Sequence, residues 1–201
     1  MHHPKRLYSS KDLDITFFQN LGKYIKTIQH KSGAIPSNED GSHDPWDHIE
    51  SIMGLNFIKE NESSKRAFNW LVKNQNEDGS WFAKYKHNIP VEKNKPTHFG
   101  PYISVAALHY YKIFNDKDFL EELWHSIELA INFSLNLQIK NGTIPWSINE
   151  HGEIENDFLV TGSSSILKSI ECGLAISYIL KKNKNNESWA ESHYLLSKAL
   201  K

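Results

Sequence analysis

The segment Trp70–Trp81, WLVKNQNEDGSW, ends an amphipathic helix at a glutamine, turns on Asp78-Gly79 and places a tryptophan directly after the turn. Glycine accepts the positive φ that a chain needs just past a helix end. The Gln75 side chain can bond backbone groups that the helix end leaves without partners. We therefore predict that the segment is a structural joint, in which Trp81 packs against a neighbouring helix and does not bind a ligand.

The segment has two in-frame relatives, YIKTIQHKSGAI (Tyr24–Ile35) and FSLNLQIKNGTI (Phe133–Ile144). In all three copies an aromatic residue precedes a Gln, a Gly lies four positions after it, and a large apolar residue follows the Gly by two. A second helix is expected after each copy, over Asp47–Ile58, His98–Phe114 and Ser163–Leu180. A unit of helix, turn, loop and helix that recurs in this way indicates a helical repeat array.

The helices that end in the copies carry apolar residues at helical spacing, which predicts outer helices with one buried and one solvated face. These residues are Phe17, Leu21, Tyr24, Ile25 and Ile28 in the first helix and Phe68, Leu71 and Val72 in the second. The loops at 82–97 and 145–160 are longer than usual. Long loops on one side of a repeat array are typical of a binding face.

The frame of aromatic, Gln, Gly and Trp resembles the QW repeat of squalene-hopene and oxidosqualene cyclases and of related prenyltransferases. Trp70–Trp81 matches it fully, and the resemblance extends from Phe17 to Ile179. It implies an all-α chain with an α/α toroid of the six-hairpin type, in which inner helices form a barrel inside outer helices. The runs Asp44–Ser51 and Thr161–Ser164 look like those of bacterial proteins labelled prenyltransferase, a label with no established reaction.

About three and a half helical hairpins can be counted, and a fourth unit begins at Glu187. We therefore expect residues 1–201 to form a single toroid domain that is partial, as an N-terminal fragment of a longer chain. Further C-terminal hairpins or an oligomer partner would close the ring.

Composition limits the function classes. The 23 Lys and Arg against 24 Asp and Glu give a formal charge of -1, which disfavours nucleic acid as a partner. No run approaches the roughly 18 apolar residues of a transmembrane helix, so peripheral membrane contact is the one membrane role left open. A single cysteine, Cys172, fits a reducing compartment, and we expect a cytoplasmic protein.

The resemblance implies a protein acting on a hydrophobic isoprenoid or lipid-like substrate in an aromatic-lined cavity, either as a cyclase or as a transferase. The D-x-D-D acid motif of such cyclases is absent, and the nearest acids gather between Glu39 and Glu50. We assign Asp44 and Asp47 as acids, His48 as the proton partner of Asp47, and Glu50 as a second carboxylate. A helix cap with a first-turn acid explains the two Asp residues equally well, and a packed core side chain explains the histidine.

Seven further residues are candidates for substrate binding. Trp46 and Trp146 each follow a proline in a loop, where an aromatic face can line a pocket. His98 and Tyr102 are expected on one face of the second inner helix. Ser164, Lys168 and Glu171 form a polar stripe on the third, although Lys168 and Glu171 also suit a simple i, i+3 ion pair.

Two other functions stay open. A carbohydrate-active toroid, either a glycosidase or a lyase, would use Asp44, Asp47 and Glu50 as paired carboxylates and stack sugars on Trp46 and Trp146. A non-catalytic scaffold would present its loop face to a partner. No histidine or cysteine spacing typical of a metal site is present, and we expect neither a metal nor a cofactor.

Overall fold

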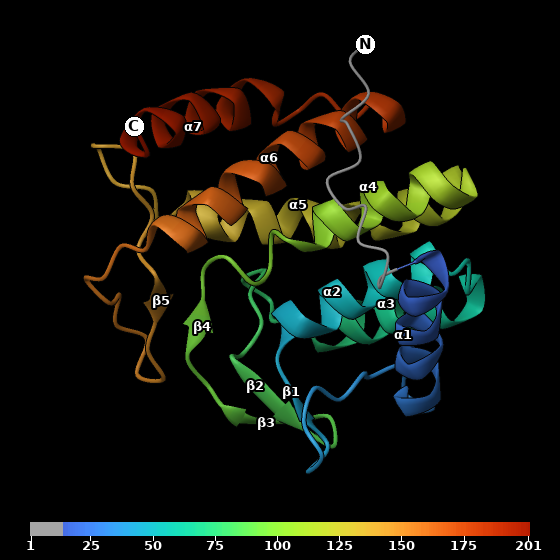
Figure 1. The fold of residues 1–201 in the computed structure, drawn as a ribbon. Coiled ribbons are helices and arrows are strands. Elements are labelled where there is room, and N and C mark those ends of the chain that lie inside the picture. Colours follow the sequence, from blue (N-terminus) through green and yellow to red (C-terminus); the bar gives the residue numbers. More distant parts are fainter. Residues whose placement is uncertain (1–13) are drawn as a thin grey trace.

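The computed structural model describes residues 14–201, in which seven helices form two layers (Figure 1). His2 and His3, a pair too short to bind a metal alone, lie outside the described residues. The inner row consists of α2 (Pro45–Phe57), α4 (Ile103–Phe114) and α6 (Val160–Leu180), which contact one another in that order. The outer helices are α1 (Ile15–Ile28), α3 (Asn61–Asn74), α5 (Lys117–Leu135) and α7 (Asn186–Ala199).

The order of outer and inner helices gives three hairpins and one further outer helix. α2 packs on α1 and α3, and α6 packs on α5 and α7. α4 packs on α5 and reaches α3 through Tyr110, which contacts Phe68 and donates to Asn61. The expected fold, an all-α partial α/α toroid of about three and a half hairpins, is therefore confirmed.

Five short strands lie at one end of the helices, the end at which α2, α4 and α6 begin (Figure 1). β1 (Ser42–His43), β2 (Lys84–Lys86) and β3 (Ile89–Glu92) form an antiparallel sheet, and β4 (Lys95–Pro96) pairs with β5 (Ser147–Ile148). His87 and Asn88 adopt positive φ angles of 51° and 64°, the conformation of a two-residue hairpin turn. The long segments expected as loops therefore contain strand pairs.

The three glutamine copies join successive outer helices. In each copy Nε2 of the Gln donates both to the Gly carbonyl of its own turn and to a Ser carbonyl in the next outer helix. The pairs are Gln29 with Gly33 and Ser63, Gln75 with Gly79 and Ser126, and Gln138 with Gly142 and Ser192. Trp81 is fully buried and donates to the Leu71 carbonyl at 2.9 Å, which confirms the predicted packing role.

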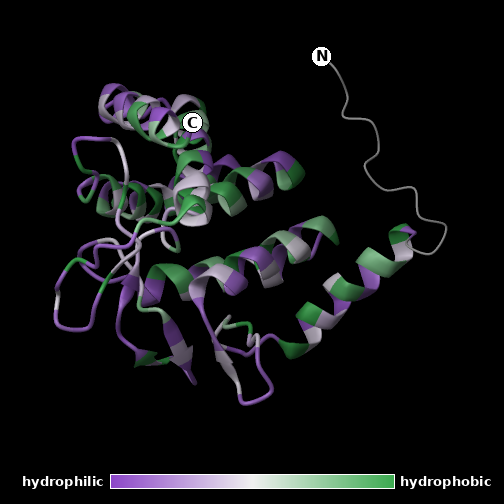
Figure 2. Cartoon of the chain, turned by 60° about the vertical axis from the view of Figure 1, so that its left-hand side comes forward, coloured by the Kyte–Doolittle hydropathy of each residue, from purple (hydrophilic) through white to green (hydrophobic). Residues whose placement is uncertain are grey.

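The expected apolar faces are buried only where a helix has a neighbour. Phe68 and Leu71 are fully buried, whereas Val72 is 40% exposed. On α1, Phe17, Leu21 and Tyr24 are exposed, because α1 stands at one end of the helical row and packs mainly on α2. Figure 2 shows this helix carrying apolar residues while projecting from the remainder of the fold. The prediction that Phe17, Leu21 and Tyr24 lie on a buried face was wrong.

The second inner helix begins five residues later than expected. α4 starts at Ile103, and the preceding segment forms turns through Gly100 and Pro101. A proline disfavours helical backbone in the residue before it, so the helix cannot extend back to His98. His98 therefore lies in the turn ahead of α4, and the predicted single face shared with Tyr102 was wrong.

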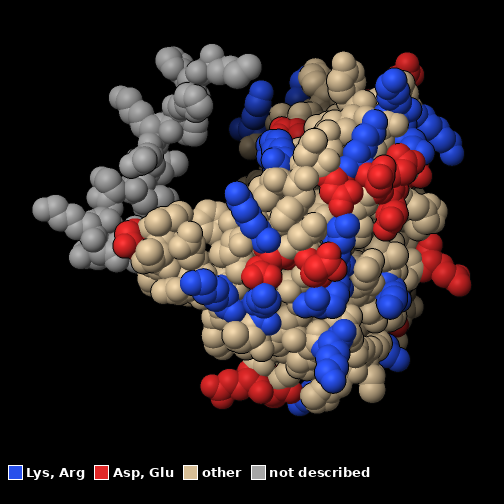
Figure 3. Space-filling view, turned by 90° about the vertical axis from the view of Figure 1, so that its right-hand side faces the viewer, with Lys and Arg blue, Asp and Glu red and all other residues tan. Residues whose placement is uncertain are grey.

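Surface features agree with the limits set by composition. The face that Figure 3 shows carries Lys and Arg interspersed with Asp and Glu, so neither sign forms a continuous field there. Among residues 14–201, no helix combines the length and the apolar character needed to cross a bilayer.

Candidate functional site

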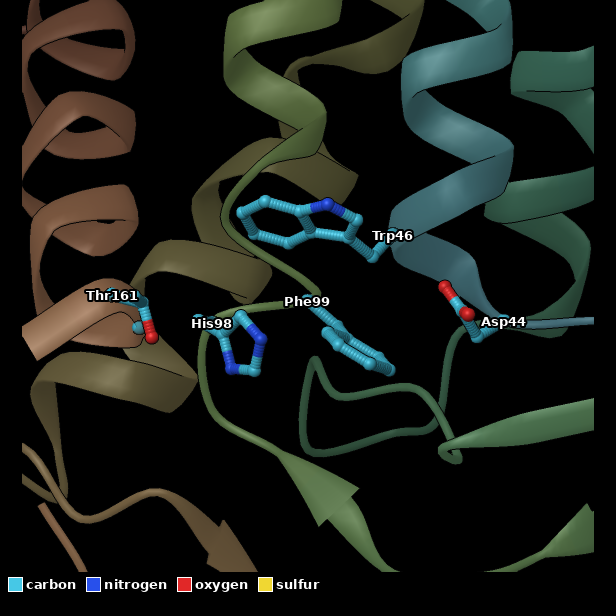
Figure 4. A pocket seen from close by; sticks show the side chains of 6 residues that line it. Asp44, Trp46, His98, Phe99 and Thr161 are labelled. Carbon is cyan, nitrogen blue, oxygen red and sulfur yellow. The ribbon is translucent and has the colours of Figure 1, made fainter. Parts of the chain in front are cut away.

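A cavity of about 340 Å³ opens where the three inner helices begin (Figure 4). Each inner helix contributes to it from the residues at or just before its first turn. The lining residues are Asp44, Trp46, His98, Phe99, Thr161 and Gly162. The toroid thus brings three segments that are distant in sequence to one place, and three of the predicted site residues meet there.

Asp44 serves both as a helix cap and as a cavity wall. It precedes Pro45, the first residue of α2, and its carboxylate accepts a hydrogen bond from the Asp47 backbone N–H at 2.8 Å. Burial raises the pKa of the Asp44 carboxyl to about 6, although this hydrogen bond acts in the opposite direction. A carboxyl group with that pKa keeps a proton in mildly acidic solution, as a general acid requires.

Asp47 and Glu50 follow on the first turns of α2 and lie outside the set of residues that line this cavity. Burial raises the pKa of Glu50, and the neighbouring Asp47 charge adds to the shift. After burial itself, the Glu50 charge is the next cause of the raised pKa of Tyr102. The Asp47 charge thus contributes to the raised pKa of both Asp44 and Glu50, and of the three acids only Asp44 lines the cavity.

His48 is a core residue, so its predicted role as the proton partner of Asp47 was wrong. Its side chain is fully buried, Nδ1 accepts the Ile35 N–H at 3.2 Å, and Nε2 lies 3.0 Å from the Ala67 carbonyl oxygen. Because Nδ1 accepts, Nε2 carries the proton and donates. Burial lowers the pKa of His48 to about 3, and a neutral ring with both nitrogens engaged has no proton to exchange.

Aromatic rings form a continuous wall beside Asp44. Trp46 stacks on Tyr102 with ring centroids 4.2 Å apart and planes 8° apart, and it lies 5.1 Å from His98. His98 in turn stacks on Trp146 at 4.2 Å. Burial lowers the pKa of His98 to about 4, so this ring is neutral and contributes an uncharged face.

A second cavity, of about 320 Å³, adjoins the first on the side of the strands. Asp44 and Phe99 line both cavities and form the boundary between them. The remaining lining residues come from the loops and short strands: Asn38, His43, Ala83, Lys84, Glu92, Asn94, Pro96 and Trp146. Of these residues, the sequence predicts only Trp146 as part of a site.

His43 forms part of that second cavity while being almost completely buried. Neither of its ring nitrogens has a hydrogen-bond partner within residues 14–201. The ring packs between Trp70, at 4.7 Å, and Tyr85, at 6.1 Å. Burial lowers the pKa of His43 to about 4, which keeps the side chain neutral.

Ser164, Lys168 and Glu171 lie along an exposed face of α6 and do not line either cavity. Lys168 Nζ pairs with Glu171 Oε2 at 2.8 Å, and Glu171 Oε1 also lies 3.2 Å from His193 Nε2. This arrangement is the i, i+3 ion pair that the spacing had also suggested. In the first cavity the residues not predicted from the sequence are Phe99, Thr161 and Gly162; Phe99 directly follows the predicted His98.

The site carries no preformed metal centre in the part of the chain that is described. No group of 3 or more His, Cys, Asp or Glu side chains between residues 14 and 201 could hold a metal ion. The functional groups among the lining residues are the Asp44 carboxyl group, the rings of Trp46, His98 and Phe99, and the Thr161 hydroxyl.

Proteins similar to this chain include several whose names describe action on carbohydrates. No family model matches the chain. A protein of Mycolicibacterium hassiacum named MMP endo-(1,4)-3-O-methyl-alpha-D-mannosidase is 35% identical over 153 residues, which cover 76% of this chain. The chain spans 42% of the length of that relative.

Solved structures with the same fold include two hydrolases. A family 105 glycoside hydrolase of C. acetobutylicum aligns with a TM-score of 0.70 and 17% identity, over 90% of this chain and 55% of its own. The unsaturated glucuronyl hydrolase of Bacillus sp. GL1 aligns with a TM-score of 0.64 and 12% identity, over 92% of this chain and 55% of its own. At such identities the likeness shows the fold alone.

These matches overturn the expected chemistry. A relative with 35% sequence identity is named a mannosidase, and the fold neighbours include glycoside hydrolases. The expectation of a terpene cyclase or prenyltransferase with a hydrophobic isoprenoid substrate was therefore wrong, and the QW-repeat resemblance is not supported. The chain is an α/α toroid that resembles glycoside hydrolases.

Proposed function

We propose that the chain forms part of a glycoside hydrolase that cleaves an α-linked mannoside, with Asp44 as the general acid. The observation that carries the proposal is a single carboxyl group with a raised pKa in an aromatic-walled cavity at the mouth of the toroid. The mannosidase relative, 35% identical over 76% of the chain, supports the same class of substrate.

The proposed reaction breaks the bond between the anomeric carbon and the glycosidic oxygen. Asp44 donates its proton to that oxygen as the bond breaks, and the leaving sugar departs as an alcohol. A water molecule adds to the anomeric carbon and loses a proton to a second carboxylate. Asp47 and Glu50, the neighbouring acids on α2, are the two candidates for that base.

The walls of the cavity favour a neutral sugar. Neither Lys nor Arg is among the lining residues of the first cavity, and the carboxyl group of Asp44 would oppose a uronate at its side. The faces of Trp46 and Phe99 suit the C–H face of a pyranose ring or an O-methyl group, both of which are apolar. A mannoside with or without 3-O-methyl groups fits this lining.

The test uses the purified chain with α-1,4-linked oligomannosides, in methylated and unmethylated form, and measures released reducing ends. We expect cleavage by the wild type and a loss of at least about a hundredfold in Asp44→Asn, the scale of one acid-base group. Asparagine caps a helix as well as aspartate does, so this variant should keep its fold.

Asp14→Asn is the matched control, because Asp14 caps α1 in the same way and lies outside both cavities. Full activity in Asp44→Asn would contradict the proposed role of Asp44. Binding of oligomannosides without turnover by the wild type would instead indicate a non-catalytic scaffold, and the absence of both would overturn the proposed function.

A further inference from the structure

We infer that the second cavity is a separate sugar subsite, so that a saccharide chain runs across Asp44 with ring units bound on both sides of it. This inference rests on the proposed function of the first cavity. It adds the location of a further binding site, the residues that form it and the expected effect of chain length.

The geometry places the scissile bond between two spaces. Asp44 and Phe99 are common to both linings, so a linear ligand that fills both cavities must pass these two side chains. The aromatic wall also extends from one space to the other: Trp46 lines the first cavity, Trp146 lines the second, and His98 contacts both rings. A general acid at such a boundary can act on a bond inside the chain.

The lining of the second cavity has the mixed character that a sugar ring requires. Phe99 and Trp146 offer flat apolar faces, while Asn38, Lys84, Glu92 and Asn94 offer donors and acceptors for hydroxyl groups. Lys84 and Glu92 are 3.5 Å apart and balance each other in charge. The space therefore favours a polar, neutral ligand.

Two polar groups in this cavity lack an intramolecular partner. The side chain of Asn94 makes no hydrogen bond to any residue from 14 to 201, although its backbone carbonyl accepts from the Ala83 N–H at 2.8 Å. The His43 ring, 1% exposed, has two unpartnered nitrogens in the same stretch. Asn94 is half-buried and lines the cavity, so its amide is available to hydroxyl groups of a ligand, whereas the His43 nitrogens are closed off from it.

The experiment measures, by titration calorimetry in the Asp44→Asn background, the affinity for methyl α-mannoside, whose single ring occupies one cavity, and for α-1,4-linked oligomannosides; cleavage of the oligomannosides by the wild type is measured in parallel. We expect the affinity to rise by about tenfold or more once the ligand is long enough to fill both cavities, the gain of one added polar-aromatic subsite. In Asn94→Ala combined with Lys84→Ala, that gain should disappear while the affinity for methyl α-mannoside is unchanged. Asn136→Ala, an exposed Asn at the end of α5, is the control and should retain the gain.

The outcomes separate the two proposals. If the wild type cleaves oligomannosides but the double variant shows the same length dependence as the wild type, the subsite inference is overturned and the proposed function stands. If the double variant weakens binding of methyl α-mannoside as much as binding of the oligomannosides, the residues do not form a separate subsite, and the inference is likewise overturned. If isothermal titration detects no binding of any length to the wild type and no cleavage occurs, both proposals fail.

Discussion

Gln75 and Ser126 form two hydrogen bonds with each other, one through each end of the glutamine amide. Gln75 Nε2 donates to the Ser126 carbonyl at 3.0 Å, and Ser126 Oγ donates to Gln75 Oε1 at 2.6 Å. The same Nε2 donates to the Gly79 carbonyl at 3.0 Å. One side chain therefore links the end of α3, the turn after it and the middle of α5. In this way the repeat stabilises the contact between successive outer helices.

Gln75→Ala should destabilise the protein, because the two carbonyls and the Ser126 hydroxyl lose their partner in a partly buried place. We expect a decrease of about 2 kcal/mol in the free energy of unfolding, measured by chemical denaturation. Gln19→Ala, an exposed glutamine on α1, is the control and should change it by less than about 0.5 kcal/mol. Equal effects of the two substitutions would contradict the role of Gln75 in joining α3 to α5.

Gly79→Ala should lower the free energy of unfolding more than replacement of a glycine whose added Cβ has room. Gly79 has a φ of 90°, and an added Cβ would overlap the carbonyl oxygen of Leu129 on α5. Gly152 has a φ of 84° but nothing within 4 Å of the added Cβ. Gly152→Ala therefore measures the backbone strain alone, about 1 to 2 kcal/mol. We expect Gly79→Ala to exceed that value by at least about 2 kcal/mol in thermal or chemical unfolding, through steric overlap. Similar losses in both variants would show that packing against α5 is not the constraint.

The fold could be predicted because its joints recur with fixed spacing. Gln75 ends a helix, Gly79 forms the turn and Trp81 packs after it, and each of these roles can be predicted from the residue type and its place in the order. What could not be predicted was which apolar residues lack a neighbour: Phe17 on α1 follows the same periodicity as Phe68 on α3, but only the latter is covered on both sides. Periodicity describes one helix, whereas burial depends on what packs against it.

His43→Phe should make stability less sensitive to acid. The pKa of His43 is lowered by burial from 6.5 to about 4, so between these values the unfolded chain binds a proton that the folded chain does not. Stability from this residue is complete above pH 6.5 and is lost as pH falls toward 4, by about 3 kcal/mol. Urea denaturation at several pH values should show a smaller acid loss in the variant. His125→Phe, at an exposed position, should leave the wild-type slope unchanged. An unaltered slope in His43→Phe would contradict the assignment.

Asp44→Asn should show the opposite dependence. In the wild type the pKa of Asp44 is raised from 3.8 to about 6. Between these values the folded protein holds a proton that the unfolded chain has released, so the free energy of unfolding falls as pH rises through this range. The variant has no such loss and keeps the cap of α2. We expect it to be more stable than the wild type by about 1 to 2 kcal/mol at neutral pH, after allowing for the lost attraction between the carboxylate and the helix dipole. The difference should shrink below pH 3.8. A less stable variant at neutral pH would show that the cap requires the charge.

The site was less accessible to prediction than the fold. Asp44 and His98 stand near expected helix starts, and Trp46 and Trp146 each follow a proline in a loop; these signals predict all four as site residues, and all four lie around the two cavities. His48 failed because a helix turns each successive residue by about 100°, so the His48 side chain is buried in the core while that of the adjacent Asp47 is only half-buried. Phe99 and Asn94 could not be predicted, because they line the same cavity only through the packing of loops that are separate in the sequence.

Trp46→Leu should weaken saccharide binding without unfolding the protein. Trp46 lines the first cavity, and its stacking on Tyr102 presents a flat surface of fixed orientation beside Asp44. Leucine keeps an apolar contact but removes the flat face, so we expect about tenfold weaker binding of an α-1,4-linked oligomannoside, about 1.4 kcal/mol. Titration calorimetry with Asp44→Asn as the background prevents turnover during the measurement. Tyr178→Leu, which removes an aromatic ring that is 82% exposed on α6 and outside both cavities, is the control and should bind as its parent does. If both substitutions weaken binding alike, the effect is not specific to the wall of the cavity.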